Sequence, residues 1–223
     1  ITNEKSSNLE LALRSAKGIE LNVVNPPVLT INTEKQKIEP YKHDVIIVYK
    51  INNVNKREGI VPGTFDDIQS YVTNGGNLII GAQDDLKEIS MKDLPVVELK
   101  GKINKPTKVC VETINQITKQ FEKDRCFTAA SSYLGAEVKK GAITFASADD
   151  KSPIIVYGEK GKGKIAYYGI FDEASDFKTS PSYPIFWDSL ISFMIGTEDI
   201  KEFNYKTGKI ATINEQKVKT PDR

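Results

Sequence analysis

Two short apolar runs constrain the fold of this chain more than any other feature. Residues 45–49 read VIIVY and residues 77–81 read NLIIG, so both runs are continuous rather than alternating. Continuous runs rich in β-branched residues are typical of strands that are buried on both faces, as in a parallel sheet. The segment between them carries apolar residues at helical spacing, which are Phe65, Ile68, Tyr71 and Val72. The sequence therefore predicts a strand–helix–strand unit whose two strands are parallel neighbours.

The first two predicted helices have recognisable ends. Ser7 and Glu10 fit a capping box, in which the Ser hydroxyl accepts a backbone N–H and the Glu reaches back, and Gly18 marks the stop. Thr64 and Asp67 occupy the same two positions at the start of the second helix. Between these helices, the apolar residues from 19 to 24 predict a further strand.

A third helix is predicted from Ser182 to Ile195. Pro184 suits a first turn, where its missing N–H costs no hydrogen bond, and Gly196 suits the stop. The large apolar residues of this segment recur at helical spacing and are Tyr183, Phe186, Trp187, Leu190, Phe193 and Met194. Such a stripe is more often core than partner surface, so we expect it to pack against the sheet.

From about Val96 the pattern changes to short β-prone runs separated by turns rich in lysine and glycine. The predicted strands are residues 96–99, 107–112, 127–130, 142–146, 153–157 and 164–170. The turn from Gly158 to Gly163 almost matches a nucleotide-binding P-loop. That motif needs Ser or Thr where Ile165 stands, and it needs a helix directly afterwards. We therefore expect a β-hairpin turn here rather than a nucleotide site.

The charge balance argues against nucleic-acid binding. The 31 Lys and Arg residues nearly cancel the 30 Asp and Glu residues in this chain of 223 residues, so the basic excess typical of nucleic-acid-binding domains is absent. No apolar run approaches the roughly 20 residues that a membrane-spanning helix needs. Because the sequence begins at Ile1 without a methionine and ends at Arg223 without a closing element, we expect a fragment of a longer protein with a first strand at or before Ile1.

The two cysteines, Cys110 and Cys126, have a spacing that fits neither a zinc site nor a CxxC redox motif. Three states are compatible with the sequence, namely two buried thiols, one disulfide, or a reactive thiol. An extracytoplasmic setting would permit oxidation to the disulfide.

Several segments resemble the class I glutamine amidotransferase-like domains. They read YKHDVIIV, DDIQSYVTNGGNLIIG, NQITKQF, SPIIVYGEKGKGKIAYYG and SPSYPIFW. The similarity is greatest to the versions in membrane-anchored aerotolerance-type proteins, which sit beside von Willebrand factor A domains. This resemblance implies an α/β fold with a flavodoxin-like parallel sheet, helices on both faces and a β-rich addition from about residue 96.

The same resemblance implies a domain organisation and a setting. Residues 1–196 would form the amidotransferase-like domain, and residues 197–223 a C-terminal extension that begins a further β-rich segment, with one strand around residues 209–213. The setting would be a soluble domain of a membrane protein, outside the cytoplasm. The expected partners are other domains of that protein or a separate protein partner, and not nucleic acid.

The catalytic residues of the amidotransferases are not matched. Those enzymes place a nucleophilic cysteine in a G-x-C-x-G turn and pair it with a histidine, because the thiolate needs an adjacent base. Here the turn carries Gly81, Ala82 and Gln83, and the sole histidine, His43, stands at the entry to a strand. We therefore expect no catalytic residue of this type, and also no cofactor and no metal ion.

Five polar residues follow predicted strands and form the candidate ligand-binding set: Asn25, Asn52, Gln83, Asp84 and Asp172. Ligands of α/β proteins bind at the carboxyl ends of the strands, where these side chains would gather. Asn and Asp are also common at strand ends simply because they build turns, and the sequence leaves this alternative open.

Two functions of different classes are compatible with these patterns. The first is a non-catalytic ligand-sensing or protein-interaction domain from a larger membrane-anchored protein. The alternative is a hydrolase or transferase that uses an unrecognised polar cleft at the carboxyl ends of the strands. Convergent charged groups with perturbed pKa values in a compact pocket would favour the enzyme.

Overall fold

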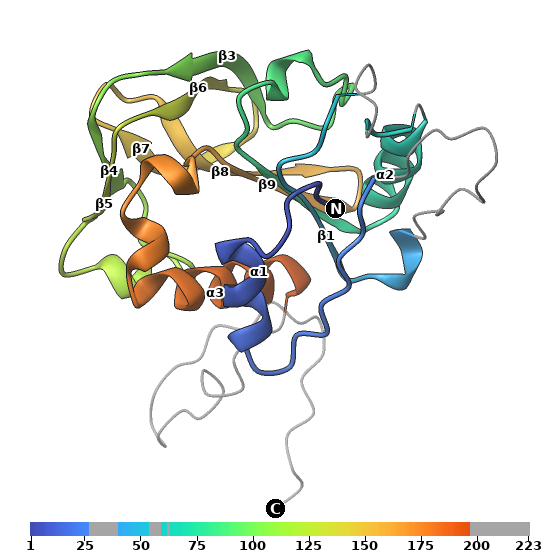
Figure 1. Cartoon of the computed structure of the whole chain (residues 1–223), viewed down its shortest axis with the longest axis horizontal. Coiled ribbons are helices and arrows are strands. Elements are labelled where there is room, and N and C mark those ends of the chain that lie inside the picture. The colour runs from blue at the N-terminus through green and yellow to red at the C-terminus, as the bar shows by residue number, and fades with distance from the viewer. Residues whose placement is uncertain (27–39, 54–58, 62, 197–223) are drawn as a thin grey trace, which may run out of the picture.

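A computed structural model describes residues 1–26, 40–53, 59–61 and 63–196, and its centre is a large mixed β-sheet (Figure 1). Within these residues the sheet has seven strands in the order β1-β2-β9-β8-β7-β4-β5. The strands are β1 (Val45–Val48), β2 (Asn77–Gly81), β4 (Thr107–Val111), β5 (Cys126–Ala130), β7 (Ile143–Ala148), β8 (Pro153–Lys160) and β9 (Gly163–Tyr168). A separate two-stranded sheet pairs β3 (Val97–Ile103) with β6 (Tyr133–Val138).

Strand direction divides the large sheet into two parts. β1, β2 and β9 are parallel, which confirms that residues 45–48 and 77–80 lie in neighbouring parallel strands. From β9 onward every pairing along the sheet is antiparallel. The predicted flavodoxin-like parallel sheet is therefore wrong, because β8, β7, β4 and β5 continue the same sheet in antiparallel pairs, and only β3 and β6 form a separate sheet.

Two further strand predictions are corrected. The stretch from residue 19 to 24 contains no strand. Residues 1–3 run beside β1 instead, where the Tyr49 N–H donates to the Ile1 carbonyl (3.1 Å) and the Asn3 N–H to the Lys50 carbonyl (3.1 Å). β6 was not predicted, although it carries the buried side chains of Tyr133 and Leu134.

The three α-helices in the described residues are α1 (Asn8–Ser15), α2 (Thr64–Thr73) and α3 (Ser182–Ile195). The Ser7 hydroxyl accepts the Glu10 N–H at 3.0 Å, as the capping pattern predicts. The predicted cap of α2 is wrong, because Gly63 holds the N-cap position without a side-chain hydrogen bond. α3 ends at Gly196, whose φ of +71° is the left-handed conformation that glycine adopts without a steric penalty.

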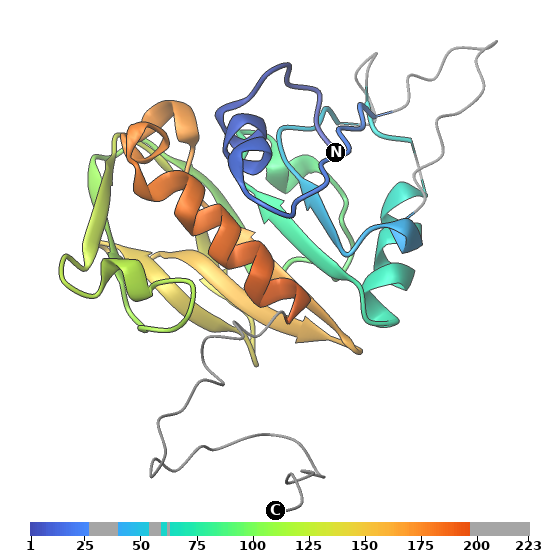
Figure 2. The ribbon, with the colours of Figure 1, turned by 90° about the horizontal axis from the view of Figure 1, so that it is seen from below.

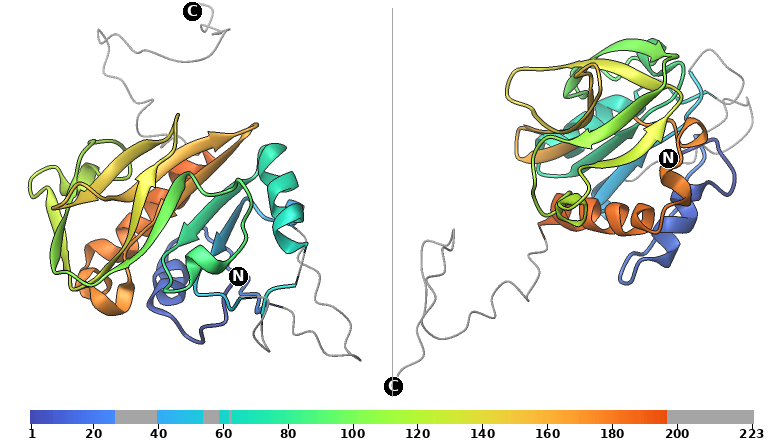
Figure 3. Two further views of the ribbon diagram at one scale, coloured as in Figure 1. Left: turned by 90° about the horizontal axis from the view of Figure 1, so that it is seen from above. Right: turned by 90° about the vertical axis from the view of Figure 1, so that its left-hand side faces the viewer.

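Helices α1 and α3 pack together on one face of the large sheet, whereas α2 and the β3–β6 pair cover the other (Figures 2 and 3). Side chains alternate between these two layers along each parallel strand. In β2, Ile79 faces α3 while Leu78 and Ile80 face α2, and all three are buried. This arrangement explains the continuous apolar runs, because both faces of these strands are covered.

The aromatic stripe of α3 lies in the core, as predicted. Phe186 and Trp187 are fully buried, and both rings pack near Tyr168 of β9, with ring centroids 5.9 and 4.9 Å away. The ring of Phe177, in the turn before α3, adds edge-on contacts with Tyr183 and Phe186. These contacts fix α3 against the sheet.

Two details of the antiparallel part decide alternatives that the sequence left open. Cys110 of β4 and Cys126 of β5 are partners across the two strands and form a disulfide. The turn between β8 and β9 closes a hairpin in which Lys160 pairs with Gly163, so it has no P-loop geometry. The predicted C-terminal extension, residues 197–223, and its strand at 209–213 lie outside the described residues.

Candidate functional site

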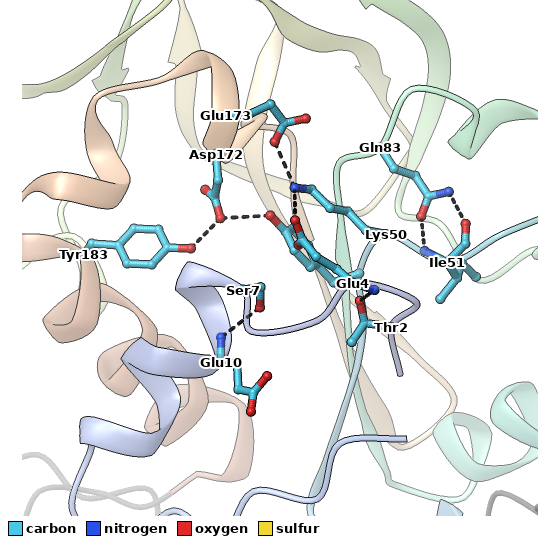
Figure 4. A network of polar contacts seen from close by, with 11 residues as sticks. Thr2, Glu4, Ser7, Glu10, Lys50, Ile51, Gln83, Asp172, Glu173 and Tyr183 are labelled. Atoms are coloured by element: carbon cyan, nitrogen blue, oxygen red, sulfur yellow. Dashed lines mark hydrogen bonds and ion pairs between the residues drawn. The ribbon is translucent and has the colours of Figure 1, made fainter. Parts of the chain in front are cut away.

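The most concentrated polar cluster at the carboxyl ends of the parallel strands is centred on Asp172. This carboxylate is only 3% exposed and accepts hydrogen bonds from three tyrosine hydroxyls. Tyr49 donates to Oδ2 at 3.0 Å, Tyr168 to Oδ1 at 2.9 Å and Tyr183 to Oδ2 at 2.5 Å. Figure 4 shows Tyr183 and Asp172 pointing toward each other from neighbouring segments. Both oxygens of the carboxylate are thus engaged.

The fold brings these tyrosines together from three elements. Tyr49 directly follows β1, Tyr168 is the last residue of β9, and Tyr183 lies in the first turn of α3. The ring of Tyr49 lies so close to Gly81 of β2 that a Cβ there would stand 2.5 Å from the ring. Glycine at the end of β2 therefore makes room for the tyrosine that binds Asp172.

Burial dominates the electrostatics of this cluster. Desolvation raises the pKa of Asp172, and the three tyrosine hydrogen bonds and the Lys50 charge oppose this shift without cancelling it. Burial and the neighbouring Asp172 raise the pKa of Tyr49, Tyr168 and Tyr183. These tyrosines are therefore stable hydrogen-bond donors rather than sources of phenolate.

Lys50 forms a second polar group beside the first. Its Nζ lies 2.9 Å from Glu4 Oε1 and 3.0 Å from Glu173 Oε2, and it stands between these two carboxylates in Figure 4. Burial opposes the ammonium charge, but the hydrogen bonds with Glu4 and Glu173 outweigh it, and the pKa of Lys50 is raised. A lysine held in this way is a poor nucleophile, because nucleophilic attack needs the neutral amine.

Gln83 ties together the two loops that follow β1 and β2. Its Oε1 accepts the Ile51 N–H at 2.8 Å, and its Nε2 donates to the Ile51 carbonyl at 2.6 Å and to Asp85 Oδ1 at 2.6 Å. The side chain is 6% exposed. The Gln83 side chain therefore forms with Ile51 the pair of hydrogen bonds that a neighbouring strand would otherwise provide.

The structure places the five predicted ligand-binding residues in different surroundings. Asp172 and Gln83 form hydrogen bonds with Tyr49 and Ile51. Asn52 follows in the same segment, and its backbone N–H donates to Asn3 Oδ1 at 2.6 Å. Asp84 is apart from them, in an exposed ion pair with Lys102 at 2.8 Å. Asn25 is exposed, just before the first stretch that the structure leaves undescribed.

Sequence reasoning missed the partners that give Asp172 its environment. Tyr183 was assigned only to the apolar stripe of α3, and Tyr49 only to a buried strand. Tyr168 and Lys50 were not singled out at all. Lys50 carried one usable signal, because it follows a buried strand directly and so had to lie at the carboxyl edge of the sheet.

Two cavities lie elsewhere on the molecule. One, of about 250 Å³, opens at the amino ends of β1 and β2, and its lining includes Tyr41, His43, Asp44, Tyr71 and Asn77. The other, of about 390 Å³, lies beside β3 and β6. His43 thus stands at the opposite end of the strands from Asp172, as the sequence predicted. Within the described ranges, no group of three or more His, Cys, Asp or Glu side chains is placed to hold a metal ion.

Comparison with known proteins identifies the family. Residues 1–190 match DUF7408, a domain of unknown function. The chain belongs to this family. A comparison with curated proteins gives no match.

Two solved structures from Salmonella typhimurium share the fold of this DUF7408 domain. Cytoplasmic protein STM3548 is 19% identical, with a TM-score of 0.65, and the alignment covers 86% of this chain and 87% of that one. Cytoplasmic protein STM1381 from strain LT2 is 15% identical, with a TM-score of 0.66, covering 84% and 86%. At such identities the likeness concerns the fold alone.

These findings correct the resemblance drawn from the sequence. The matched family is DUF7408 and the similar structures are the two Salmonella proteins, so the assignment to the glutamine amidotransferase-like domains is wrong. The predicted membrane-anchored, extracytoplasmic setting was implied by that resemblance and is withdrawn with it; the two similar structures are described as cytoplasmic proteins. None of the helices in the described ranges has the length and apolar character that crossing a membrane requires.

Proposed function

We propose that this DUF7408 domain is a non-catalytic binding domain that recognises a ligand or a protein partner. The observation that carries the proposal is the saturation of the polar groups at the carboxyl ends of the parallel strands. Asp172 accepts three tyrosine hydroxyls, and Lys50 is shared between two carboxylates. The Asp172 carboxylate and the Lys50 amine, the candidates for a base and a nucleophile, are thus engaged in contacts within the protein.

The enzyme alternative needs a reactive group that can reach a substrate. A general base must lie within hydrogen-bonding reach of the proton that it removes. Asp172 is nearly inaccessible to solvent, and both of its carboxylate oxygens accept hydrogen bonds from buried tyrosine hydroxyls. Glu4 keeps one buried oxygen, Oε2, without a partner among the described residues. A single open acceptor with a cationic lysine on its other oxygen does not form a nucleophile–base pair.

Perturbed pKa values at this cluster do not reverse that conclusion. Active sites shift pKa values, but buried structural networks do so as well. In this cluster the shifts make Asp172 easier to protonate and keep the tyrosines neutral, which favours a fixed set of hydrogen bonds. A binding role is the function that remains compatible with this geometry.

A turnover screen tests the proposal. The purified protein is incubated with nitrophenyl esters, phosphates and glycosides, and with glutamine for ammonia release, and we expect no turnover above buffer. The matched variant is Lys50→Met, which keeps the aliphatic stem and removes the charge, and circular dichroism together with urea unfolding establishes that the variant compared is folded. Turnover in the wild type that Lys50→Met abolishes would establish an enzyme and overturn the proposal.

A further inference from the structure

The cavity at the amino ends of β1 and β2 has a chemistry that the Asp172 cluster lacks. Its volume is about 250 Å³, slightly below the range of about 300–1,000 Å³ that is usual for drug-sized ligands. It therefore suits a small group. Tyr41 stands at its edge with 67% of its surface exposed, whereas Tyr71 is 4% exposed and forms part of the wall.

The wall of this cavity is rigid. The Tyr71 hydroxyl donates to the His43 carbonyl at 2.8 Å and accepts the Asn77 N–H at 3.1 Å. Asn77 Nδ2 donates to the Asp44 carbonyl at 3.0 Å. One face of the Tyr71 ring lies against Gly76, where a Cβ would stand 2.2 Å from the ring. The site is thus preorganised before any ligand arrives.

Two aromatic rings meet at this rigid wall. The centroids of Tyr41 and Tyr71 are 5.9 Å apart, and the ring planes make an angle of 76°. Tyr41 belongs to η1 (Pro40–Lys42), which lies beside α2 in Figures 1 and 2. The edge-to-face contact between the two rings holds the Tyr41 ring in place at the cavity, and the face of an exposed aromatic ring attracts organic cations.

Two features at the cavity attract a cation. The cavity lies at the C-terminal end of α2, where the helix dipole places negative partial charge. The exposed Asp44 carboxylate adds a full negative charge and has no hydrogen bond or ion pair to another described side chain. Three lysines lie nearby. Lys164 donates its ammonium to the Phe193 carbonyl at 3.1 Å, whereas Lys42, directly after Tyr41, and Lys162, beside Gly75, are exposed and can turn toward solvent.

We propose that this cavity binds an organic ammonium ion, with the exposed ring of Tyr41 as the aromatic wall, Tyr71 as its fixed support and Asp44 as the counter-charge. The ammonium group belongs either to a small free molecule or to a methylated lysine side chain of a partner protein. The inference deepens the proposed binding role by assigning it a site and a ligand class. It does not involve the Asp172 cluster.

The test is a titration followed by amide chemical shifts, at about pH 8, where histidine side chains are normally neutral. The probe is choline, and the control ligand is 3,3-dimethylbutan-1-ol, which has the same shape without the charge. We expect choline to shift the amide signals of Gly75, Gly76 and Asn77, and the neutral analogue to bind much more weakly. Equal binding of the two ligands, or shifts confined to other regions, would overturn the proposal.

Substitutions of Tyr41 and Asp44 measure how much each side chain contributes to choline binding. Tyr41→Ala should weaken choline binding about tenfold, whereas Tyr41→Phe retains the ring and should bind nearly as the wild type does. Asp44→Asn should weaken binding about threefold, as the loss of one exposed charge pair predicts. The matched control, Asp93→Asn, changes another exposed carboxylate and should have no effect. Unchanged affinity in both Tyr41→Ala and Asp44→Asn would contradict the proposed site.

A second pair of probes separates the two sources of the ammonium group. A short peptide containing trimethyl-lysine is compared with the same peptide containing norleucine and with free choline. Tighter binding of the methylated peptide than of choline would identify a protein partner as the source of the ammonium group. Equal binding would indicate that only the ammonium group is recognised, as expected for a small free molecule. A failure of all cationic probes refutes the ammonium site while the turnover screen still tests the binding role, so the two failures are distinguishable.

Discussion

The two ends of the parallel strands β1, β2 and β9 use similar residue types in opposite ways. At the carboxyl ends, Asp172 and its three tyrosines are buried and bonded to one another. At the amino ends, Tyr71 is equally fixed, but Tyr41 and Asp44 remain exposed at the edge of a cavity. Tyrosine and aspartate therefore stabilise the fold at one end and are available to a ligand at the other.

This comparison shows that the position of a side chain in an α/β sheet does not decide whether that side chain is available to a ligand. The carboxyl ends of parallel strands are the usual ligand site. Here strand β9, the turn that follows it and helix α3 supply Tyr168, Asp172 and Tyr183, which fill that position with internal contacts. The amino ends are not filled in this way, because α2 and η1 lie beside the cavity there.

The largest expected effect is alkaline unfolding caused by the buried tyrosines. The folded-state pKa values of Tyr49, Tyr168 and Tyr183 are raised, whereas those of unfolded tyrosines are about 10. Above about pH 10 the unfolded chain loses protons that the folded protein keeps, so stability falls as pH rises. Each tyrosine contributes up to about 1.4 kcal/mol per pH unit, and the three together about 4.

Urea unfolding at a series of alkaline pH values measures this slope, and phenolate absorbance reports the ionisation. The Tyr183→Phe variant provides the control, because it removes one of these tyrosines and should lower the slope by up to about 1.4 kcal/mol per pH unit. Phenolate formation by these tyrosines in a protein that stays folded would show that the carboxyl-end cluster is open to solvent, and the contrast between the two ends would be lost.

The next largest effect is expected from Asp172→Ala. This change leaves three buried hydroxyls without their acceptor, and breaking a buried polar network typically costs about 3–5 kcal/mol. The control is Asp188→Ala on the exposed side of α3, which should stay within about 0.5 kcal/mol of the wild type. Chemical denaturation measures both. Equal stabilities of the two variants would mean that the cluster contributes little and that its burial serves another purpose.

Sequence patterns predicted the local elements better than their pairing. The runs at residues 45–48 and 77–80 gave a correct parallel pair because their continuous apolar character reflects cover on both faces. The same reasoning failed for β6, since Gly135 and Ala136 weaken its strand pattern. Gly135 is needed there because a Cβ would stand 2.6 Å from the side chain of Ile103. A close contact with another strand is invisible in the sequence of either.

The order of strands in the sheet was beyond the reach of local patterns. Whether β4, β7 and β8 form an addition or join the main sheet depends on contacts between distant segments, and the disulfide between Cys110 and Cys126 follows only once β4 and β5 are paired. The candidate site shows the same limit. Asp172 could be named from its place after a strand, but Tyr49 is 123 residues away in sequence.

The smallest expected effect comes from one chemical change made at both ends of the strands. Tyr183→Phe removes a hydroxyl that donates to a buried carboxylate, and hydrogen bonds to charged groups contribute about 1.5–3 kcal/mol. Tyr41→Phe removes a hydroxyl from a ring that is 67% exposed, so stability should change by less than about 0.5 kcal/mol. Thermal and urea unfolding of the two variants compare the same atom in the two settings. If Tyr41→Phe were as costly as Tyr183→Phe, the Tyr41 hydroxyl would be part of the fold, and the amino-end cavity would be no more available to a ligand than the Asp172 cluster.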